Sequence, residues 1–555
     1  MESTKDILFF PGISWATSRW TQILGVGLAA WLFYGTFLAI YRVTLHPLAK
    51  FPGPKFAGAT YWYEVWFDVV RWGKFTHEIK RLHEIYGPIV RINPDEVHCN
   101  DPEFVDIIYA NGSKKRNKSK MFVEGFAADL KNVRDLRRPE VTHQSANFCH
   151  QGGFGTVDHA HHRLRRAAAS KYFSRAQIAK LEWVIHQDAQ RLCDKFLRYQ
   201  GRGPFEAASA YSCFTADIVS DYCFGQPFGF LHQADWEPNF KEAVYAMLQL
   251  IHIMRHFPWT TWLMEAIPLG VIRKLSSKMG ALAEQSKVKM PEMVRQTKSA
   301  YEAGIKRDRT TVIHSLLESD LPPEEKTIKR LTGEATVMLA AGTETTASAL
   351  SVCTYHLLRN PDVVEKIRAE LLSVTMNPKE IPTWATLERL PYFSASIMEA
   401  LRMGYGSPSR LPRIAPDEDL VYQGTWTPPG ASSPVEVTHV IPRGYASGMS
   451  AWIMHHDERA FPDSNRFLPK RWLDEDGQRR RGLERYLLTF SKGSRQCLGM
   501  QLAYCELHVA IAAMTLRVLP KLRLYETTDA DVEYDYDLAV AMPKKGSKGI
   551  RLEVV

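Results

Sequence analysis

A glycine-containing loop with one cysteine near its end constrains this chain more than any other feature. The loop, Phe490–Gly499, reads Phe-Ser-Lys-Gly-Ser-Arg-Gln-Cys-Leu-Gly, and a helix is expected directly after it, from Met500 to Val518. Glycine lets a backbone turn tightly and approach a flat ligand closely. A cysteine at a helix start faces unpaired N–H groups and the positive end of the helix dipole, which favour the thiolate. Cys497 could therefore bind iron, act as a nucleophile or be buried, and burial is the commonest case for a lone cysteine.

The composition is that of a large globular chain. Of its 555 residues, 45% are hydrophobic and 24% are charged, which is enough apolar material for a large core. The net charge of +9 is a mild basic excess, and the chain has no basic stripe or zinc-finger spacing, so nucleic-acid binding is not expected. The eight cysteines form no Cys-x-x-Cys pair, which argues against a disulfide framework or a zinc site and suits a reducing compartment.

The amino-terminal part of the chain is predicted to span a membrane. No charged residue lies between Arg19 and Arg42, and this apolar run is long enough to cross a bilayer as a helix. We predict an anchor at residues 20–41 after a short lumenal segment, residues 1–19. A buried core helix is disfavoured by the terminal position, and a cleaved signal peptide by the missing small-residue cleavage site. Basic residues after the run outweigh those before it, which places the remaining chain in the cytosol.

A proline-rich segment, residues 42–60, follows the predicted anchor. Within it, residues 46–54 read His-Pro-Leu-Ala-Lys-Phe-Pro-Gly-Pro. Prolines fix φ and remove hydrogen-bond donors, so we expect a stiff, extended hinge between the membrane and a domain of residues 61–555.

The domain is predicted to be mainly helical. Apolar periodicity predicts helices at residues 75–86, 178–199, 209–223, 240–256, 331–358 and 393–403, and a short strand at 88–94. The aromatic segment 257–264 is expected to break the helical pattern, either as core or as a lip that touches the bilayer.

The long helix predicted at 331–358 contains a polar cluster, Ala-Ala-Gly-Thr-Glu-Thr-Thr, at residues 340–346. Glycine and threonine are poor helix formers in the middle of an apolar helix. The carboxylate and hydroxyls either bond to the local backbone or serve chemistry at a helix distortion. Because these polar residues interrupt an otherwise apolar helix, the second alternative, a role in chemistry, is favoured.

Further motifs follow in a fixed order. Glu399-Ala-Leu-Arg402 puts a carboxylate and a guanidinium on one helix face, a pair that is common by chance. Phe-Pro-x-x-x-x-Phe-x-Pro-x-Arg-Trp at residues 461–472 comes next, and then the cysteine loop. Together with the 340–346 cluster and the anchor, this order closely resembles fungal microsomal cytochrome P-450 monooxygenases over essentially the whole chain. The hinge and residues 86–98 are most similar to secondary-metabolism members such as trichodiene oxygenase.

The resemblance implies the cytochrome P-450 fold, mainly α with small β-sheets, behind a single amino-terminal transmembrane helix. It also implies haem b as cofactor. Cys497 would be the axial thiolate on the haem iron, and so the metal ligand. Phe490 would pack beside the thiolate and help to set the redox potential, while Gly493 and Gly499 would let the loop pass under the porphyrin.

Basic side chains from three segments are expected to bind the haem propionates. Arg495 belongs to the cysteine loop, and Arg413 to an extended segment before it. His162 and Arg166 match the family's aromatic-x-x-x-Arg helix, with histidine in place of the more usual tryptophan.

The resemblance assigns catalytic roles within the long helix. Glu344 and Thr345 match the family's acid–alcohol pair, which delivers protons during oxygen activation. Ala341 and Gly342 would leave space for oxygen beside the iron.

Glu399, Arg402 and Arg471 would form a buried charge network that supports the thiolate loop. Loss of one member would strand a buried charge, at a cost of roughly several kcal/mol.

The implied activity is a monooxygenase that takes electrons from NADPH through cytochrome P-450 reductase. It would use O2 to hydroxylate or epoxidise a lipophilic small molecule of terpenoid or polyketide type in secondary metabolism, at the endoplasmic reticulum membrane. Lys492 and Arg165 would belong to a basic face that docks the acidic reductase. One rival is an oxygen-independent isomerase or lyase, against which Glu344 and Thr345 argue. The other is a non-catalytic, membrane-tethered haem protein, against which the intact cysteine loop argues.

Two stretches, within residues 132–151 and 427–440, look longer than the family normally has. Each is either a surface loop or sequence that a different exon choice would remove. An insertion that disturbed the haem or the substrate wall would impair activity.

Overall fold

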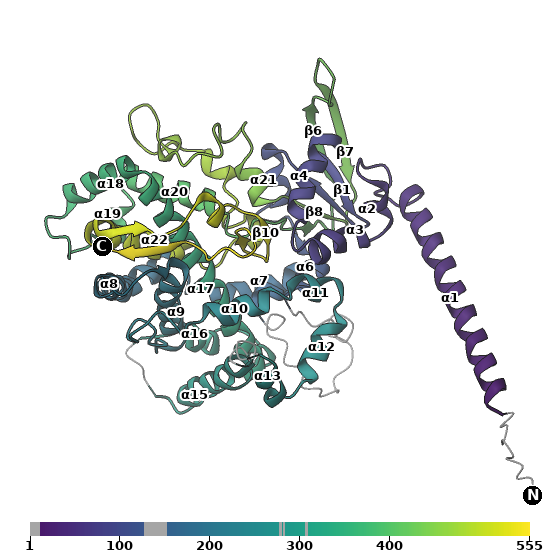
Figure 1. Cartoon of the computed structure of the whole chain (residues 1–555), viewed down its shortest axis with the longest axis horizontal. Helices are drawn as coiled ribbons and strands as arrows, with labels where there is room; N and C mark the ends of the chain where they lie inside the picture. The colour runs from purple at the N-terminus through teal and green to yellow at the C-terminus, as the bar shows by residue number, and fades with distance from the viewer. Residues whose placement is uncertain (1–11, 127–151, 277–279, 281–282, 306–308) are drawn as a thin grey trace, which may run out of the picture.

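The computed structural model describes residues 12–126, 152–276, 280, 283–305 and 309–555. Helices make up most of the body, from which the first helix projects; some of the small sheets lie on the side of that helix, and carboxyl-terminal strands lie on the opposite side (Figure 1). The fold is therefore mainly α with small β-sheets, as the sequence predicts.

The projecting helix α1 (Gly12–Thr44) contains the predicted anchor and extends beyond it at both ends. Its segment Trp20–Thr44 is long and apolar enough to cross a membrane, and no part of the scored window is buried. At about 1.5 Å per residue, 25 residues cover about 37 Å, more than the hydrocarbon core of a bilayer. Large apolar side chains such as Trp31 and Phe33 are exposed, as expected for a helix surrounded by lipid.

The segment after α1 differs from the extended hinge that the prolines predict. It forms turns and a short helix, α2 (Lys55–Ala59), which packs against β1. Leu48 and Phe51 are buried in a core cluster, and the Pro52 carbonyl accepts a hydrogen bond from the Arg91 amide at 2.8 Å. Burial of the apolar residues between the prolines outweighs the extended preference of the prolines themselves.

The largest sheet joins strands that are far apart in the sequence. Its order is β1 (Ile89–Asn93), β2 (Glu96–Cys99), β8 (Ala446–Gly448), β5 (Arg413–Ile414) and β3 (Asn117–Lys118). The strand predicted at 88–94 is confirmed as β1, which pairs antiparallel with β2. Two small sheets consist of β4 (Phe205–Glu206), β12 (Arg551–Val554) and β9 (Leu522–Leu524), and of β10 (Tyr536–Asp537) and β11 (Ala541–Met542).

The stretch at 427–440 belongs to a hairpin that projects from the body in Figure 1. Strand β6 (Leu420–Trp426) pairs with β7 (Val435–Ile441) in unbroken antiparallel register. Residues 427–440 therefore form the turn and most of the second strand of this hairpin. The stretch at 132–151 lies outside the described residues.

The main core is formed by long helices packed around α17 (Ile328–Arg359), which corresponds to the helix predicted at 331–358. Helix α9 (Ala207–Phe224) is buried on almost every side and packs along α17. The other long helices are α4 (Phe75–Tyr86), α7 (His159–Ser170), α8 (Arg175–Arg198), α15 (Met290–Glu302), α18 (Pro361–Val374), α20 (Pro391–Gly404) and α22 (Met500–Arg517).

Shorter elements complete the chain. They include α3 (Trp62–Val65), the π-helix η1 (Trp66–Val70), α5 (Val105–Ile108), α6 (Lys120–Glu124), α13 (Leu269–Leu275), α16 (Val312–Glu318), η6 (Pro323–Lys326), α19 (Trp384–Leu387), α21 (Ala451–His455), η7 (Pro469–Trp472) and η9 (Gly493–Arg495).

Two predicted elements between α9 and α17 are wrong. The single helix predicted at 240–256 is divided into α10 (Lys241–Leu248) and α11 (Ile251–His256). The predicted break at 257–264 is instead a helix, α12 (Trp259–Ala266), preceded by Pro258. Proline is compatible with a helix start because its missing N–H has no intrahelical partner there.

Candidate functional site

The cysteine loop is held in place by its own backbone and by the segment around Tyr109. Gly493 has a φ of +75°, and a Cβ there would lie 2.2 Å from the Tyr109 carbonyl oxygen, so only glycine fits. The Cys497 amide donates to the Phe490 carbonyl at 2.9 Å and closes the loop. Gly499 differs, because a Cβ there would meet no protein atom within 4 Å. The requirement for glycine is therefore shown at Gly493 and not at Gly499.

Cys497 is the one exposed thiol among the cysteines that the structure describes. The protein around it is nonetheless dense, and burial raises the pKa of its thiol, although the Gly499 amide and the Arg166 guanidinium oppose that rise. The helix start therefore favours the thiolate less than the sequence suggests. A thiol that is deep in the protein but open on one side has the surroundings expected of a ligand to an enclosed metal.

The polar cluster of α17 divides between two faces of the helix. Ala341 and Thr345 are one turn apart and exposed, although the helix around them is largely buried. The Thr345 hydroxyl donates to the Ala341 carbonyl at 2.7 Å, and the helix continues unbroken, so the distortion expected here is not found. Gly342 has a packing role, because a Cβ there would lie 2.9 Å from Val219 of α9.

Glu344 faces away from the exposed side of α17. Its carboxylate is buried and accepts a hydrogen bond from the Ser212 hydroxyl of α9 at 2.9 Å. Burial raises the pKa of Glu344 to about 7, although the Ser212 hydrogen bond and Lys241 partly oppose the rise. The structure does not bring the carboxylate into contact with the Thr345 hydroxyl, so any proton passing between them needs an intervening group.

Replacing Glu344 with glutamine is expected to stabilise the protein most at high pH. A carboxyl with a raised folded-state pKa costs no stability below its unfolded pKa, and the cost grows as pH rises through the folded value. A rise from 4.5 to about 7 corresponds to a cost on the order of 3 kcal/mol above the folded pKa. Denaturant unfolding at about pH 5 and about pH 8 measures this difference. An equal stability difference between variant and parent at both pH values would contradict the prediction.

Basic side chains gather beside the cysteine loop without carboxylate partners. Arg495, Arg413 and His162 are buried, and Arg166 is partly buried. In the described part of the chain, none of the four forms an ion pair with a carboxylate. Burial, together with the charges of the neighbouring Arg413 and Arg166, lowers the pKa of Arg495 to about 9. Buried cations without a counter-charge are unfavourable, so an anionic ligand would stabilise this group. Haem propionates are ligands of that kind.

The backbone already binds part of these guanidinium groups. Arg495 Nη1 donates to the Thr156 carbonyl at 2.5 Å, and among the described residues its Nε has no hydrogen-bond partner. Arg413 Nη2 donates to Ser491 Oγ at 3.1 Å, and Arg166 Nη1 donates to the Gln496 carbonyl at 2.7 Å. The residues present therefore fit a haem whose propionates reach this basic group.

Arg165 does not contribute to a basic docking face. Its side chain is largely buried and pairs with Glu325. Lys492 is also partly buried, and its ammonium donates to the Glu484 carbonyl at 3.1 Å.

Glu399, Arg402 and Arg471 meet in one buried network. Arg402 donates to both carboxylate oxygens of Glu399 at 2.8 and 2.9 Å, and Arg471 Nε donates at 3.0 Å. The Trp472 indole N–H adds a bond of 2.9 Å. Burial alone raises the pKa of Glu399, but the hydrogen bond and charge of Arg402, followed by Arg471, hold it below its ordinary value.

His455 connects this network to the cysteine loop, and sequence reasoning missed it. The Leu488 amide donates to His455 Nε2 at 2.8 Å, so Nδ1 carries the proton and donates to the Arg402 carbonyl at 2.8 Å. Leu488 lies two residues before Phe490. The pair His455-His456 upstream of the Phe-Pro motif was the available signal.

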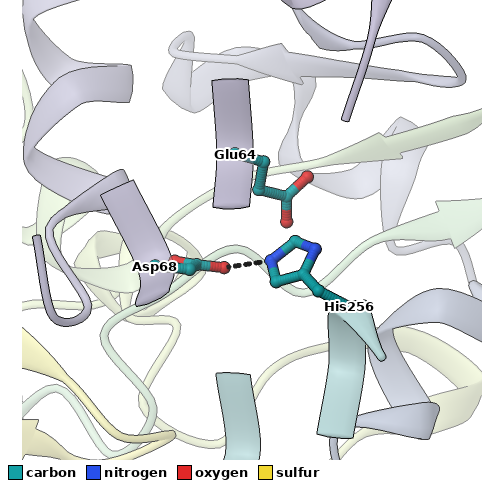
Figure 2. Close-up of side chains that lie close together, drawn as sticks. All are labelled: Glu64, Asp68 and His256. Atoms are coloured by element: carbon teal, nitrogen blue, oxygen red, sulfur yellow. Dashed lines mark hydrogen bonds and ion pairs between the residues drawn. The ribbon is translucent and has the colours of Figure 1, made fainter. Parts of the chain in front are cut away.

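A second cluster of ionisable side chains, also missed, lies away from the cysteine loop. Figure 2 shows Glu64, Asp68 and His256 together, with their ligand-type atoms within 4.8 Å of one another, close enough to hold a metal ion. Buried arginines already bind both carboxylates: Arg410 pairs with Glu64, and Arg255 Nη1 lies 3.3 Å from Asp68. We therefore interpret the cluster as a charge network that joins η1 to α11.

A large cavity in the described part of the chain does not border Cys497. It measures about 1010 Å³ and lies between the start of α18, the end of α20 and the segment Asn465–Lys470. Its lining mixes Arg359, Lys366 and Asp529 with aromatic side chains, unlike the apolar wall expected around a lipophilic substrate.

Comparison with known proteins identifies the family. The cytochrome P450 family model matches residues 52–519. The cytochrome P450 monooxygenase ppzE of Metarhizium majus is 45% identical, covering 84% of this chain and 94% of the relative. Tryptophan 6-hydroxylase fscE of Fusarium equiseti is 38% identical (93% and 94% covered), and fusicoccadiene C-8 hydroxylase of Phomopsis amygdali is 34% identical (93% and 93%). With this match over nearly its whole length, the chain belongs to the cytochrome P450 monooxygenases, a family that binds haem b through a cysteine thiolate.

Proposed function

We propose that this protein is a membrane-anchored monooxygenase that receives NADPH-derived electrons from cytochrome P-450 reductase. It hydroxylates or epoxidises a lipophilic small molecule in secondary metabolism. The observation that carries the proposal is the exposed thiol of Cys497 in a dense site beside buried arginines that lack carboxylate partners. Family membership adds the reaction class.

Each residue near the loop has a distinct part in this proposal. Cys497 holds the iron, and Phe490, whose ring centroid lies 5.1 Å from that of Tyr504, shields the thiolate side. Arg495 and Arg413 hold the propionates, together with His162 and Arg166. When bound, the haem supplies the redox centre at which O2 is activated.

The hydroxyl of Thr345 takes part in proton transfer at the exposed face of α17. Its O–H now donates to the Ala341 carbonyl, which leaves the oxygen lone pairs free to accept a hydrogen bond from water. A water molecule that is hydrogen-bonded to the Thr345 oxygen can transfer a proton toward the haem site. Glu344, ionisable near neutral pH, is a proton reservoir on the far side of the same helix turn.

Replacing Thr345 with alanine is expected to leave haem binding intact and to uncouple NADPH consumption from product formation. Loss of one hydrogen-bonding group in proton delivery corresponds to about 1.4 kcal/mol, or roughly a tenfold fall in product per NADPH. The measurement is the ratio of product formed to NADPH consumed. Thr345→Ser, which keeps the hydroxyl, is the matched control, and normal coupling in the alanine variant would remove Thr345 from this role.

The substrate is proposed to be of terpenoid or polyketide type. One relative is named for fusicoccadiene and another for tryptophan, so the family members similar to this chain differ in substrate. The chain should be expressed with a reductase in a host fed candidate substrates under heavy-isotope O2. A monooxygenase product gains one heavy oxygen atom per oxidation, whereas product without heavy oxygen would favour the isomerase or lyase alternative.

We also propose that α1 anchors the protein in the endoplasmic reticulum membrane with the catalytic domain in the cytosol. The exposed apolar surface of α1 supports this. Trp62 and Trp259 are also exposed, and Trp62 lies beside Phe257, with ring centroids 6.2 Å apart. These aromatics form a second apolar contact suited to the bilayer interface.

A further inference from the structure

Helix α7 is held from two sides by different partners. Arg166 donates from one face to the Gln496 carbonyl, next to the proposed iron ligand. His161 and Arg165 extend from another face to Glu325 in η6. Residues four apart share a helix face, and adjacent residues are rotated by about 100°. The contacts of α7 with Glu325 and with the cysteine loop therefore fix its rotation together.

Glu325 is buried and binds three cationic side chains at once. His161 Nε2 lies 2.6 Å from Oε1, while Arg165 Nε and Arg330 Nε donate to Oε2 at 2.8 and 2.7 Å. Burial alone raises the pKa of Glu325, but these partners hold it well below its ordinary value, so the carboxylate stays ionised. Arg330 belongs to the first turn of α17, so this ion network ties α7 to the helix that carries the proposed proton-handling residues.

One short segment continues the network to the cysteine loop. Arg165 Nη1 donates to the Thr156 hydroxyl at 2.9 Å. The carbonyl of the same Thr156 accepts from Arg495 Nη1 at 2.5 Å, and Arg495 Nη2 donates to the carbonyls of Val157 and Asp158 at 2.7 and 3.1 Å. Thr156 is therefore held through its side chain by the ion network, and through its backbone it holds Arg495.

We infer that Glu325 is a positioning residue for the haem. It acts through Arg165 and Thr156, and the group that it positions is the guanidinium of Arg495. This inference rests on the proposed haem-binding role of the cysteine loop. Arg495 lies two residues before Cys497, and its Nε, buried and without a hydrogen-bond partner in the described part of the chain, remains available to a propionate.

Two substitutions test the path at different points. Glu325→Gln removes the charge that holds Arg165. Thr156→Ala removes the relay hydroxyl, which also donates to the Gly152 carbonyl at 3.2 Å, together with the γ-methyl group, whereas Thr156→Ser removes only the methyl group. The readout is the rate of haem transfer from the purified ferric protein to excess apomyoglobin. We expect about a tenfold faster transfer for Glu325→Gln, equivalent to about 1.4 kcal/mol, and a smaller rise for Thr156→Ala. Thr156→Ser should match the parent.

The double variant separates positioning from general destabilisation. If Glu325 acts through Thr156, adding Thr156→Ala to Glu325→Gln changes the rate less than it changes the parent's rate. Fully additive effects on the logarithm of the rate would overturn the inference. If Glu325→Gln does not fold, the comparison of the two Thr156 variants tests the inference. Equal rates of haem transfer for Thr156→Ala and Thr156→Ser would overturn the inference. A parent protein without a thiolate-type CO spectrum would instead reject the proposed function, so the two failures are distinguishable.

Discussion

Product formation by the Cys497→Ala variant is expected to fall to the background of the host, a loss on the order of a thousandfold or more. The physical reason is that alanine offers no lone pair to the iron. The buried arginines beside the loop remain able to bind the anionic propionates. Haem therefore binds more weakly and without a thiolate. The measurement is product formed per unit time by membranes that contain equal amounts of parent and variant, with reductase and NADPH in excess.

A matched control separates ligation from packing. Cys505→Ala removes another thiol, eight residues later in α22, whose side chain is buried in the core. That variant should lose some stability and keep its activity. Retention of substantial activity by Cys497→Ala, with activity lost in Cys505→Ala, would mean that the iron ligand has been placed at the wrong residue.

Replacing Glu399 with glutamine is expected to destabilise the protein by about 3–5 kcal/mol. The substitution keeps the size of the side chain but removes the charge that Arg402 and Arg471 share, and it leaves two guanidinium groups buried without a carboxylate. The neighbouring His455 bond should weaken as well, and with it the contact to Leu488 before the cysteine loop. Urea unfolding of the purified protein measures the loss.

The chain supplies a control with the same spacing on a solvent-exposed helix. Glu292 and Arg295 form an i,i+3 pair on α15, and both side chains are about half exposed. Glu292→Gln should cost only about 0.2–0.5 kcal/mol, because water screens the exposed pair. Similar costs for the two glutamine variants would show that burial does not give the Glu399 network its strength.

Sequence periodicity predicted the helical framework well, because amphipathic and apolar patterns act locally. Helix α4 has the bounds that the pattern predicts, and α17 extends the predicted helix by only a few residues. The motif order also identified the family. The fold class and the reaction class could therefore be predicted from the sequence alone. The three members of the Glu399 network, which were predicted together, do lie together.

Features that depend on contacts between residues far apart in the sequence could not be predicted from the sequence. Proline content predicted an extended hinge, but Leu48 and Phe51 find a buried surface only once β1 and the rest of the core are in place. Glu325 has no local motif, and its role follows from Arg165, some 160 residues earlier in the chain. The orientation of Glu344 toward Ser212 likewise depends on how α9 packs on α17.

The reduced, CO-bound absorption spectrum of the unmodified full-length protein shows whether a thiolate binds the haem iron. We expect a Soret band at the strongly red-shifted position that a thiolate ligand to haem iron produces, because Cys497 is the open thiol beside the basic group. A Soret band at the ordinary position of haem with a nitrogen ligand or a neutral thiol, in freshly prepared protein with full haem content, would contradict it.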